Sequence, residues 1–229
     1  MSVYTPVSRK QLESFLTLYD QGRLIGFCGI KAGIENSNFF VTTERGEFVL
    51  TLFEKLAAHE LPFFLRLMAH LAEHGIPSAH PIADQKGDYL QRLNGKPAAL
   101  VRRLRGESPR DANLQHCRAM GHALARLHLA GRSFSGHHDN NRGYEWWLAV
   151  REVLHSRLDR DDAQLLDAEL QFQRRDRFGD LPRGVIHADL FRDNAMFVGD
   201  KLTGIIDFYY ACNDVLLYDL AITVNDWCG

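Results

Sequence analysis

The sequence changes its pattern once, near its middle, and this change limits the possible folds more than any other feature. In the first half, short apolar and β-branched runs come in pairs joined by turn residues. Residues 39–43 and 48–53 flank a polar turn, and two further runs flank Asn94-Gly95, the strongest short signal for a β-hairpin. A helix is expected over residues 60–73. The first half therefore predicts a small antiparallel sheet with a helix packed on it.

The second half has a different character. Apolar residues recur at helical spacing over residues 114–129, 144–158 and 161–178. A sheet-rich half followed by a helix-rich half predicts an α+β protein of two lobes with a cleft between them. Clefts between lobes are the usual place where small ligands bind, so we expect the functional site there.

The expected lobes have definite limits. We expect a small N-terminal lobe over residues 1–100, a hinge over residues 101–106 and a mainly helical C-terminal lobe over residues 107–229. The length of 229 residues fits one large domain or two lobes, at roughly 150 residues per domain. A chain of this length buries a sizeable core without disulfides or metal ions.

The charge balance excludes several classes of protein. The chain has 27 lysine and arginine residues and 29 aspartate and glutamate residues, whereas sequence-independent nucleic-acid binding needs an excess of basic residues. No apolar run approaches the roughly 18 residues of a membrane span, and no secretion signal is visible. The four cysteines are scattered, which is typical of reduced thiols. We expect a cytoplasmic protein with neither a nucleic-acid nor a membrane partner.

The residues most indicative of chemistry lie in one stretch near the C-terminal end. His187, Asp189 and Asn194 have the spacing of the His-Arg-Asp-x-x-x-x-Asn catalytic loop of kinases, with Ala188 in place of the arginine. A lone His-x-Asp is more often structural. Here, however, it is followed by a hairpin and by an apolar strand that ends at Asp207. The combination predicts a phosphotransferase site.

The hairpin suggests how a metal ion would be held. If its turn centres on Asp200-Lys201, Asn194 lies directly opposite Asp207 on the paired strand. Opposed Cβ atoms are about 4.5–5.5 Å apart, so an amide oxygen and a carboxylate in these positions can share one Mg²⁺. A slip of one residue would turn one of the two side chains to the other face.

The charges of these side chains suggest their roles. Transfer of a nucleotide phosphoryl group needs cations and positioning more than covalent help. We expect Asn194 and Asp207 to hold Mg²⁺, and Asp189 to accept or orient the proton of an attacking hydroxyl. His187 is expected to brace the loop, and Arg192 to add positive charge near the transferred group.

This stretch resembles the aminoglycoside phosphotransferase/choline kinase-like family, a branch of the protein-kinase-like fold, and more narrowly the bacterial homoserine kinases of that family. The resemblance implies a two-lobed fold with ATP between the lobes, and phosphorylation of the homoserine hydroxyl in threonine biosynthesis. It also implies that Asp219 is a structural aspartate that steadies the catalytic loop. The matching segments span nearly the whole chain: residues 33–42, 48–54, 187–194, 219–221 and 225–227.

The resemblance also implies a nucleotide site. Residues 29–38 correspond to the loop over the phosphates, and the hinge would offer backbone groups to adenine. The implied nucleotide-binding residues are Gly33, Asn36, Ser37, Asn38, Thr51, Arg102 and Leu104.

Two departures from the family pattern stand out. Thr51 lies near the position where kinases of this fold carry a phosphate-binding lysine; Lys31 or Lys55 would have to substitute, with Glu60 as the partner on the helix. Family members also continue beyond the point that corresponds to Gly229, so we expect part of the acceptor pocket to lie outside this sequence.

Three alternatives stay open at this stage. The acceptor could be choline or ethanolamine, or an aminoglycoside, rather than homoserine. The chain could also be a catalytically silent kinase-like module that binds nucleotide or a partner. For the acceptor, residues 137–141 form a polar loop that a zwitterionic substrate could use, and Tyr209-Tyr210 could line its site.

Overall fold

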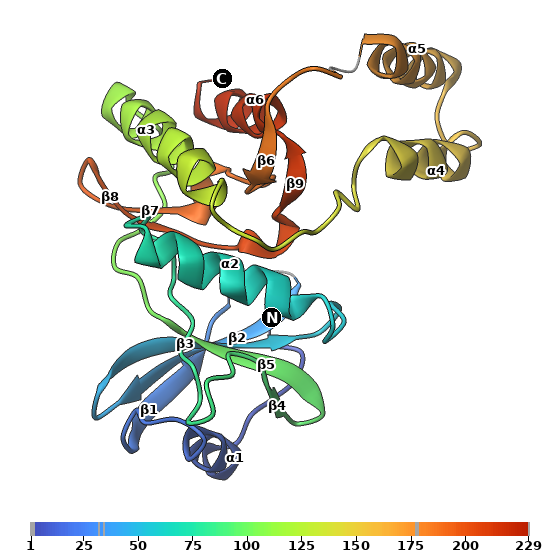
Figure 1. Cartoon of the computed structure of the whole chain (residues 1–229). Helices are drawn as coiled ribbons and strands as arrows, with labels where there is room; N and C mark the ends of the chain where they lie inside the picture. Colours follow the sequence, from blue (N-terminus) through green and yellow to red (C-terminus); the bar gives the residue numbers. More distant parts are fainter. Residues whose placement is uncertain (1–2, 32, 34, 177–178, 229) are drawn as a thin grey trace.

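A computed structural model describes residues 3–31, 33, 35–176 and 179–228 and shows two lobes (Figure 1). In the N-terminal lobe the described strands form one antiparallel sheet in the order β1-β2-β3-β5-β4. The strands are β1 (Leu24–Gly29), β2 (Asn36–Thr43), β3 (Gly46–Phe53), β4 (Gln91–Leu93) and β5 (Lys96–Arg102). Both predicted hairpins are present.

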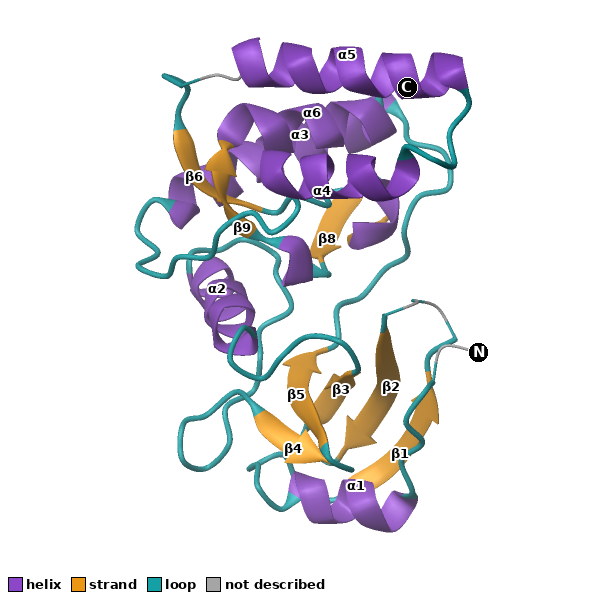
Figure 2. Cartoon of the chain, turned by 90° about the vertical axis from the view of Figure 1, so that its right-hand side faces the viewer, coloured by secondary structure: helices purple, strands orange, loops and turns teal. Residues whose placement is uncertain are grey.

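The two helices of this lobe lie on opposite faces of the sheet (Figures 1 and 2). Helix α1 (Arg9–Leu16) buries Leu12, Phe15 and Leu16 in a core that it shares with the sheet. Helix α2 (Leu61–Glu73) packs instead in a second core that contains Phe53 of the sheet and most of the buried side chains of the C-terminal lobe. Helix α2 therefore joins the sheet to the C-terminal lobe through one shared core.

The C-terminal lobe is mainly helical. Its helices are α3 (Leu114–Gly131), α4 (Tyr144–Leu154), α5 (Arg160–Asp176) and α6 (Leu216–Trp227). Helices α4 and α5 lie together at one side of the lobe (Figure 1) and are joined by an ion pair between Arg151 and Asp167, with an N–O distance of 2.7 Å. None of the helices in the described part of the chain is long and apolar enough to span a membrane.

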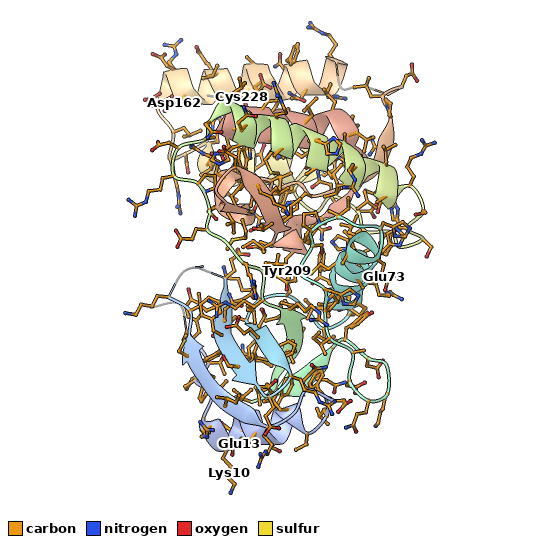
Figure 3. The ribbon with its side chains drawn as sticks, turned by 90° about the vertical axis from the view of Figure 1, so that its left-hand side faces the viewer. Lys10, Glu13, Glu73, Asp162, Tyr209 and Cys228 are labelled. Carbon is orange, nitrogen blue, oxygen red and sulfur yellow. The ribbon has the colours of Figure 1, made fainter. Side chains whose placement is uncertain are left out.

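Two short strand pairs of the C-terminal lobe flank the segments that contain the predicted site residues. Strands β6 (Arg183–Ile186) and β9 (Cys212–Val215) pair with each other, as do β7 (Ala195–Val198) and β8 (Lys201–Ile205). The short helices η1 (Arg192–Asn194) and η2 (Phe208–Tyr210) flank the β7–β8 hairpin. At the junction of the lobes, the Tyr209 ring packs on Phe53 of β3 and Phe64 of α2, with centroid distances of 5.0 and 6.0 Å (Figure 3).

Candidate active site

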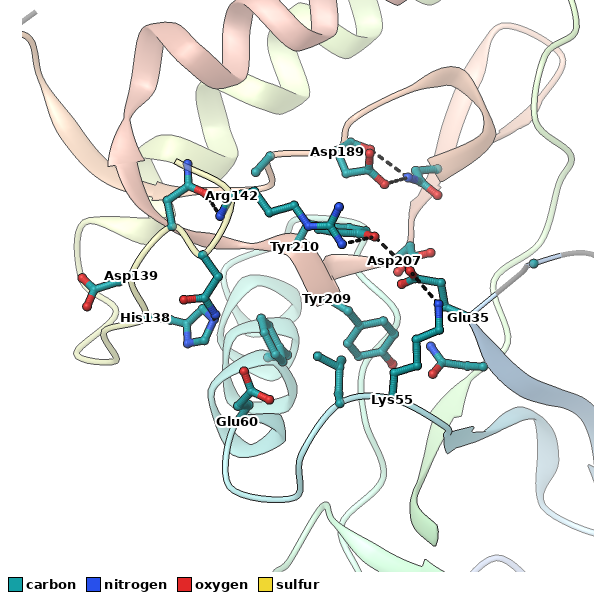
Figure 4. A pocket seen from close by; sticks show the side chains of 18 of the residues that line it. Glu35, Lys55, Glu60, His138, Asp139, Arg142, Asp189, Asp207, Tyr209 and Tyr210 are labelled. Atoms are coloured by element: carbon teal, nitrogen blue, oxygen red, sulfur yellow. Dashed lines mark hydrogen bonds and ion pairs between the residues drawn. The ribbon is translucent and has the colours of Figure 1, made fainter. Parts of the chain in front are cut away.

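A cavity of about 600 Å³ lies between the lobes. Six of the residues predicted for the site line it: Gly33, Asn36 and Asn38 from the sheet lobe, and Asp189, Asn194 and Asp207 from the helical lobe. Figure 4 shows Asp189 and Asp207 on the helical side, with Glu35 and Lys55 facing them from the sheet side. The structure therefore brings together the residues predicted for the catalytic loop, the metal ion and part of the phosphate loop.

The loop after β6 is held by the fully buried His187. The backbone N–H of Asp189 donates to Nδ1 of this ring at 3.3 Å, so the ring proton is on Nε2, which donates to the carbonyl of Ile206 at 3.0 Å. Burial lowers the pKa of His187, which favours the neutral ring. These contacts fit the bracing role expected for His187, since both ring nitrogens are used within the protein.

Asp219 of α6 also holds this loop, through hydrogen bonds to its backbone. Its carboxylate is fully buried and accepts hydrogen bonds from the backbone N–H groups of His187 and Ala188, at 3.0 and 2.9 Å, and from Nε2 of His128 at 2.8 Å. Ala188 has a φ of 62°, in the left-handed region that favours glycine. The two charge-assisted hydrogen bonds from the backbone to Asp219 hold the loop in this conformation.

Asp189 and Asn194 are in direct contact. Nδ2 of Asn194 donates to the backbone carbonyl of Asp189 at 2.7 Å and to its Oδ2 at 2.9 Å. Both amide hydrogens are therefore used, and the carbonyl oxygen of Asn194 is the end of the side chain that can bind a cation. Burial and the nearby Asp207 raise the pKa of Asp189 to about 6.

Asp207 lies at the opposite side of the same cluster. Burial, Glu35 and Asp193 raise the pKa of Asp207 to about 6. Its backbone has a φ of 62° and a ψ of 55°, which ends β8 and starts η2. Several carboxylates thus share one partly buried region, although no set of three His, Cys, Asp or Glu side chains in the described residues has the arrangement of a metal site.

The predicted register of the β7–β8 hairpin is wrong. Val198 pairs with Lys201, so the turn lies at Gly199-Asp200, where Gly199 takes the positive φ (57°) that a tight turn requires. A bulge adds one residue to β8 between the residues that pair with Phe197 and Met196, so the register changes by one from there on. The carbonyl of Asn194 accepts from the N–H of Ile206 at 2.9 Å, so Asn194 lies opposite Ile206 rather than Asp207. Instead, the left-handed backbone conformation of Asp207 places this residue at the cavity wall.

Two of the residues predicted to bind nucleotide do not line the cavity. Ser37 is buried on the far face of β2, where it accepts from the backbone N–H groups of Tyr4 and Thr5 and donates to Glu54 at 2.7 Å. Thr51 is buried and donates to the side-chain carbonyl of Asn38 at 2.8 Å. Thr51 therefore positions Asn38, which does line the cavity.

The structure distinguishes between the two lysines that could replace the strand lysine of other kinases. Lys55, just after β3, lines the cavity and lies 3.7 Å from a carboxylate oxygen of Glu35. Lys31 does not line it, and Ile34 of the same loop lies outside the described residues. Glu60 is at the cavity wall, where its carboxylate accepts from the backbone N–H of Ala57. Of the two lysines that the sequence left open, Lys55 is the one in the site.

Neither the hinge residues nor Arg192 line the cavity. The N–H of Arg102 donates to the carbonyl of His80 at 2.9 Å, and Leu104 packs in the core between α2 and the C-terminal lobe. The guanidinium of Arg192 bonds to Asp226 of α6, with an Nε–Oδ2 distance of 3.2 Å. This ion pair directs the positive charge toward α6 and away from the reacting groups, in contrast to the role that the sequence suggested.

Sequence reasoning missed Arg142 and Glu35, which both line the cavity. Arg142 directly follows the polar loop 137–141, and this loop was the one available signal for it. The hydroxyl of Tyr210 donates to Glu35 at 3.1 Å, so the segment before β2 and η2 are in contact across the cavity.

The fold and the cavity together define a class of protein. A sheet lobe and a helical lobe enclose a cavity, and a His-x-Asp-x-x-x-x-Asn loop lies on its helical wall, which is the arrangement of protein-kinase-like phosphotransferases. The sequence profile of the phosphotransferase enzyme family (APH) matches residues 26–229. The chain belongs to the phosphotransferase enzyme family.

Curated relatives resemble the chain over its whole length. The homoserine kinase of Methylobacillus flagellatus is 54% identical over 228 residues, which cover 100% of this chain and 72% of that protein. The homoserine kinase of Methylobacillus glycogenes is 51% identical with the same coverage. That of Janthinobacterium sp. (strain Marseille) is 46% identical over 232 residues, again with 100% and 72% coverage. These relatives confirm the family that the motifs predicted.

Solved structures show the same fold. An amicoumacin kinase (hAmiN) in complex with AMP-PNP, Ca²⁺ and Ami has a TM-score of 0.76 and 17% identity, over 96% of this chain and 69% of that one. Spectinomycin phosphotransferase APH(9)-Ia, in complex with ADP and spectinomycin, has a TM-score of 0.69 and 14% identity, over 98% of this chain and 77% of that one. They confirm the predicted protein-kinase-like fold.

Proposed function

We propose that this protein is an ATP-dependent kinase that phosphorylates the hydroxyl group of L-homoserine. One observation carries the proposal: the side chains of Asp189, Asn194 and Asp207 face one cavity between the lobes. The names of the relatives that match the whole of this chain supply the acceptor. We further propose a cytoplasmic enzyme of threonine biosynthesis, which agrees with the four unpaired cysteines.

In this proposal Asp189 is the catalytic residue. The acceptor hydroxyl would donate its hydrogen bond to the Asp189 carboxylate, which orients the oxygen lone pair toward the phosphoryl group and takes up the proton. Asn194 holds one carboxylate oxygen, Oδ2, by the hydrogen bond of 2.9 Å, and this fixes the direction of the other oxygen. Positioning of this kind is the main contribution that a phosphotransferase makes to rate.

Asn194 and Asp207 fit a magnesium ion. Both offer hard oxygen atoms at the cavity wall, and Mg²⁺ prefers such ligands together with waters and substrate phosphates. Glu35 and Asp193 lie near Asp207 and raise its pKa. A bound cation would offset the repulsion among these carboxylates. When bound, the ion would neutralise charge on the transferred phosphate.

The sheet lobe would hold the nucleotide. Asn36 and Asn38 present amide groups from β2, and Lys55 presents the one lysine ammonium in the cavity wall formed by the described residues. We assign to Lys55 the phosphate contact that kinases of this fold make with a strand lysine. Its ammonium lies 3.7 Å from a carboxylate oxygen of Glu35, which also lines the cavity.

The proposed function is tested by release of ADP. Purified protein with Mg-ATP should release ADP only when L-homoserine is added, and the product should be O-phosphohomoserine by mass spectrometry. Choline, ethanolamine and an aminoglycoside serve as parallel acceptors. Turnover with one of these and none with homoserine would assign the protein to another branch of the family.

The metal assignment predicts that Asp207→Asn weakens magnesium binding. Removal of one ligand charge should raise the Mg²⁺ concentration at half-maximal activity by about tenfold or more, because ligand charge sets cation affinity. A magnesium titration at fixed ATP measures this, and calorimetry of Mg-ATP binding gives a second readout. The exposed Asp161→Asn on α5 is the control. Equal magnesium requirements for the two variants would remove Asp207 from the metal site.

A further inference from the structure

The helical wall of the cavity carries an arginine to which no role has been given. Arg142 lines the cavity, and it is the only arginine among the described residues that do so. Its guanidinium lies over the ring of Tyr210, at 4.7 Å from the centroid, and within 5.5 Å of the ring centre of Trp146. One N–H donates to the Tyr210 hydroxyl at 3.3 Å (Figure 4).

The backbone under Arg142 is anchored to the core of the lobe. Its N–H donates to the side chain of Asn140 at 2.9 Å, and the amide of Asn140 donates to Asp214, a buried carboxylate of β9, at 2.8 Å. Two residues earlier, the N–H of His138 donates to the side chain of Asn213 at 2.9 Å. The loop is thus fixed to β9, and the ring contacts hold the side chain, so the guanidinium is preorganised although it is solvent-accessible.

The charges around the cavity define what Arg142 can bind. Lys55 and most of the carboxylates come from other elements, whereas Arg142 enters from the loop that precedes α4, which also brings Asp139 to the cavity wall. The Tyr210 hydroxyl links Arg142 to Glu35, so the guanidinium lies beside the carboxylate cluster with donors left for a further group. A guanidinium uses five N–H donors, of which one is directed to Tyr210, and two parallel donors match a carboxylate. The chemistry that fits is an anionic group at the far end of an acceptor whose hydroxyl reaches Asp189.

We propose that Arg142 binds the α-carboxylate of the acceptor and so selects an amino acid as substrate. This inference rests on the proposed function, because it requires the hydroxyl of the acceptor at Asp189. In homoserine three carbon atoms lie between the hydroxyl oxygen and the carboxyl carbon, and one cavity holds both Asp189 and Arg142. Choline and aminoglycosides carry positive charge and no carboxylate, so Arg142 repels them.

The test compares L-homoserine with L-homoserinamide, which keeps the hydroxyl and the ammonium group and lacks the negative charge. The wild-type protein should prefer homoserine in kcat/KM. In Arg142→Gln, kcat/KM for homoserine should fall by about 10- to 100-fold, the usual loss for a charge-assisted contact, mainly through KM. The value for homoserinamide should stay the same or rise, because Arg142 no longer repels its ammonium group, and the KM for ATP should change little. Arg142→Lys should retain part of the preference, since it keeps the charge without the paired donors.

Exposed Arg157, which follows α4, supplies the matched control Arg157→Gln. Circular dichroism spectra of all variants check that the fold is kept. An equal loss for both acceptors, or a raised KM for ATP, would overturn the inference, because the arginine would then act on the phosphate or on the loop. An unchanged preference in Arg142→Gln would also overturn it. If wild-type protein itself shows no homoserine-dependent ADP release, the proposed function fails, and the inference fails with it.

Discussion

Asp189→Asn should lower kcat with L-homoserine by about 10²- to 10⁴-fold, the range contributed by a general base in the transition state. The asparagine keeps the size of the side chain, and its carbonyl oxygen can still accept from Nδ2 of Asn194. The variant should therefore fold normally and still bind Mg-ATP. What it loses is the negative oxygen that orients the hydroxyl and accepts its proton.

Two measurements separate this result from a general defect. Initial rates at saturating ATP and homoserine give kcat, and calorimetric titration with Mg-ATP reports nucleotide binding independently of turnover. Asp161→Asn, on the exposed surface of α5, makes the same change in charge and should keep the wild-type rate. A variant within tenfold of wild type would show that Asp189 is not the base. A wild-type protein without any turnover would instead support the silent binding module.

The sequence predicted the fold well because its signals are local. The turn Asn94-Gly95 has positive φ values of 51° and 79°, which are those of the tight hairpin turn that this dipeptide favours. The alternating pattern of β2 has the same origin, since successive side chains of a strand face opposite sides. The same alternation explains the incorrect prediction for Ser37: it lies between Asn36 and Asn38, so it must face away from the cavity that they line.

The site was predicted less completely because its remaining features are not local. The register between Asn194 and Asp207 depends on a bulge, where Thr203 donates to the backbone carbonyls of Arg105 and Met196 at 2.5 and 3.0 Å. That contact joins the hinge to β8, and nothing in the hairpin sequence itself specifies it. Arg142 was missed for the same reason, since its place is set by contacts with η2 and β9 that lie far along the chain.

The hydrogen bonds that Asp219 accepts from the catalytic loop and from His128 predict a large loss of stability on its substitution. In Asp219→Ala the N–H groups of His187 and Ala188 and the Nε2 atom of His128 lose their acceptor within the core. Each buried donor left unpaired costs about 1–3 kcal/mol, so the free energy of unfolding should fall by about 3–5 kcal/mol. Urea unfolding followed by circular dichroism measures this. Asp88→Ala, at an exposed turn, should change it by less than about 0.5 kcal/mol.

The same substitution should lower activity even in molecules that remain folded. Ala188 has its left-handed backbone while its N–H and that of His187 are held by one carboxylate, and Asp189 follows directly. Without that carboxylate the loop can relax, and a displacement of about 1 Å at the reacting group costs roughly 100-fold in rate. Asp219→Asn keeps one acceptor oxygen and should fall between wild type and Asp219→Ala in both stability and kcat. If Asp219→Ala kept the wild-type kcat per folded molecule, the other contacts of the loop, such as those of His187 with Ile206 and of Asn194 with Asp189, would suffice, and Asp219 would have no part in positioning Asp189.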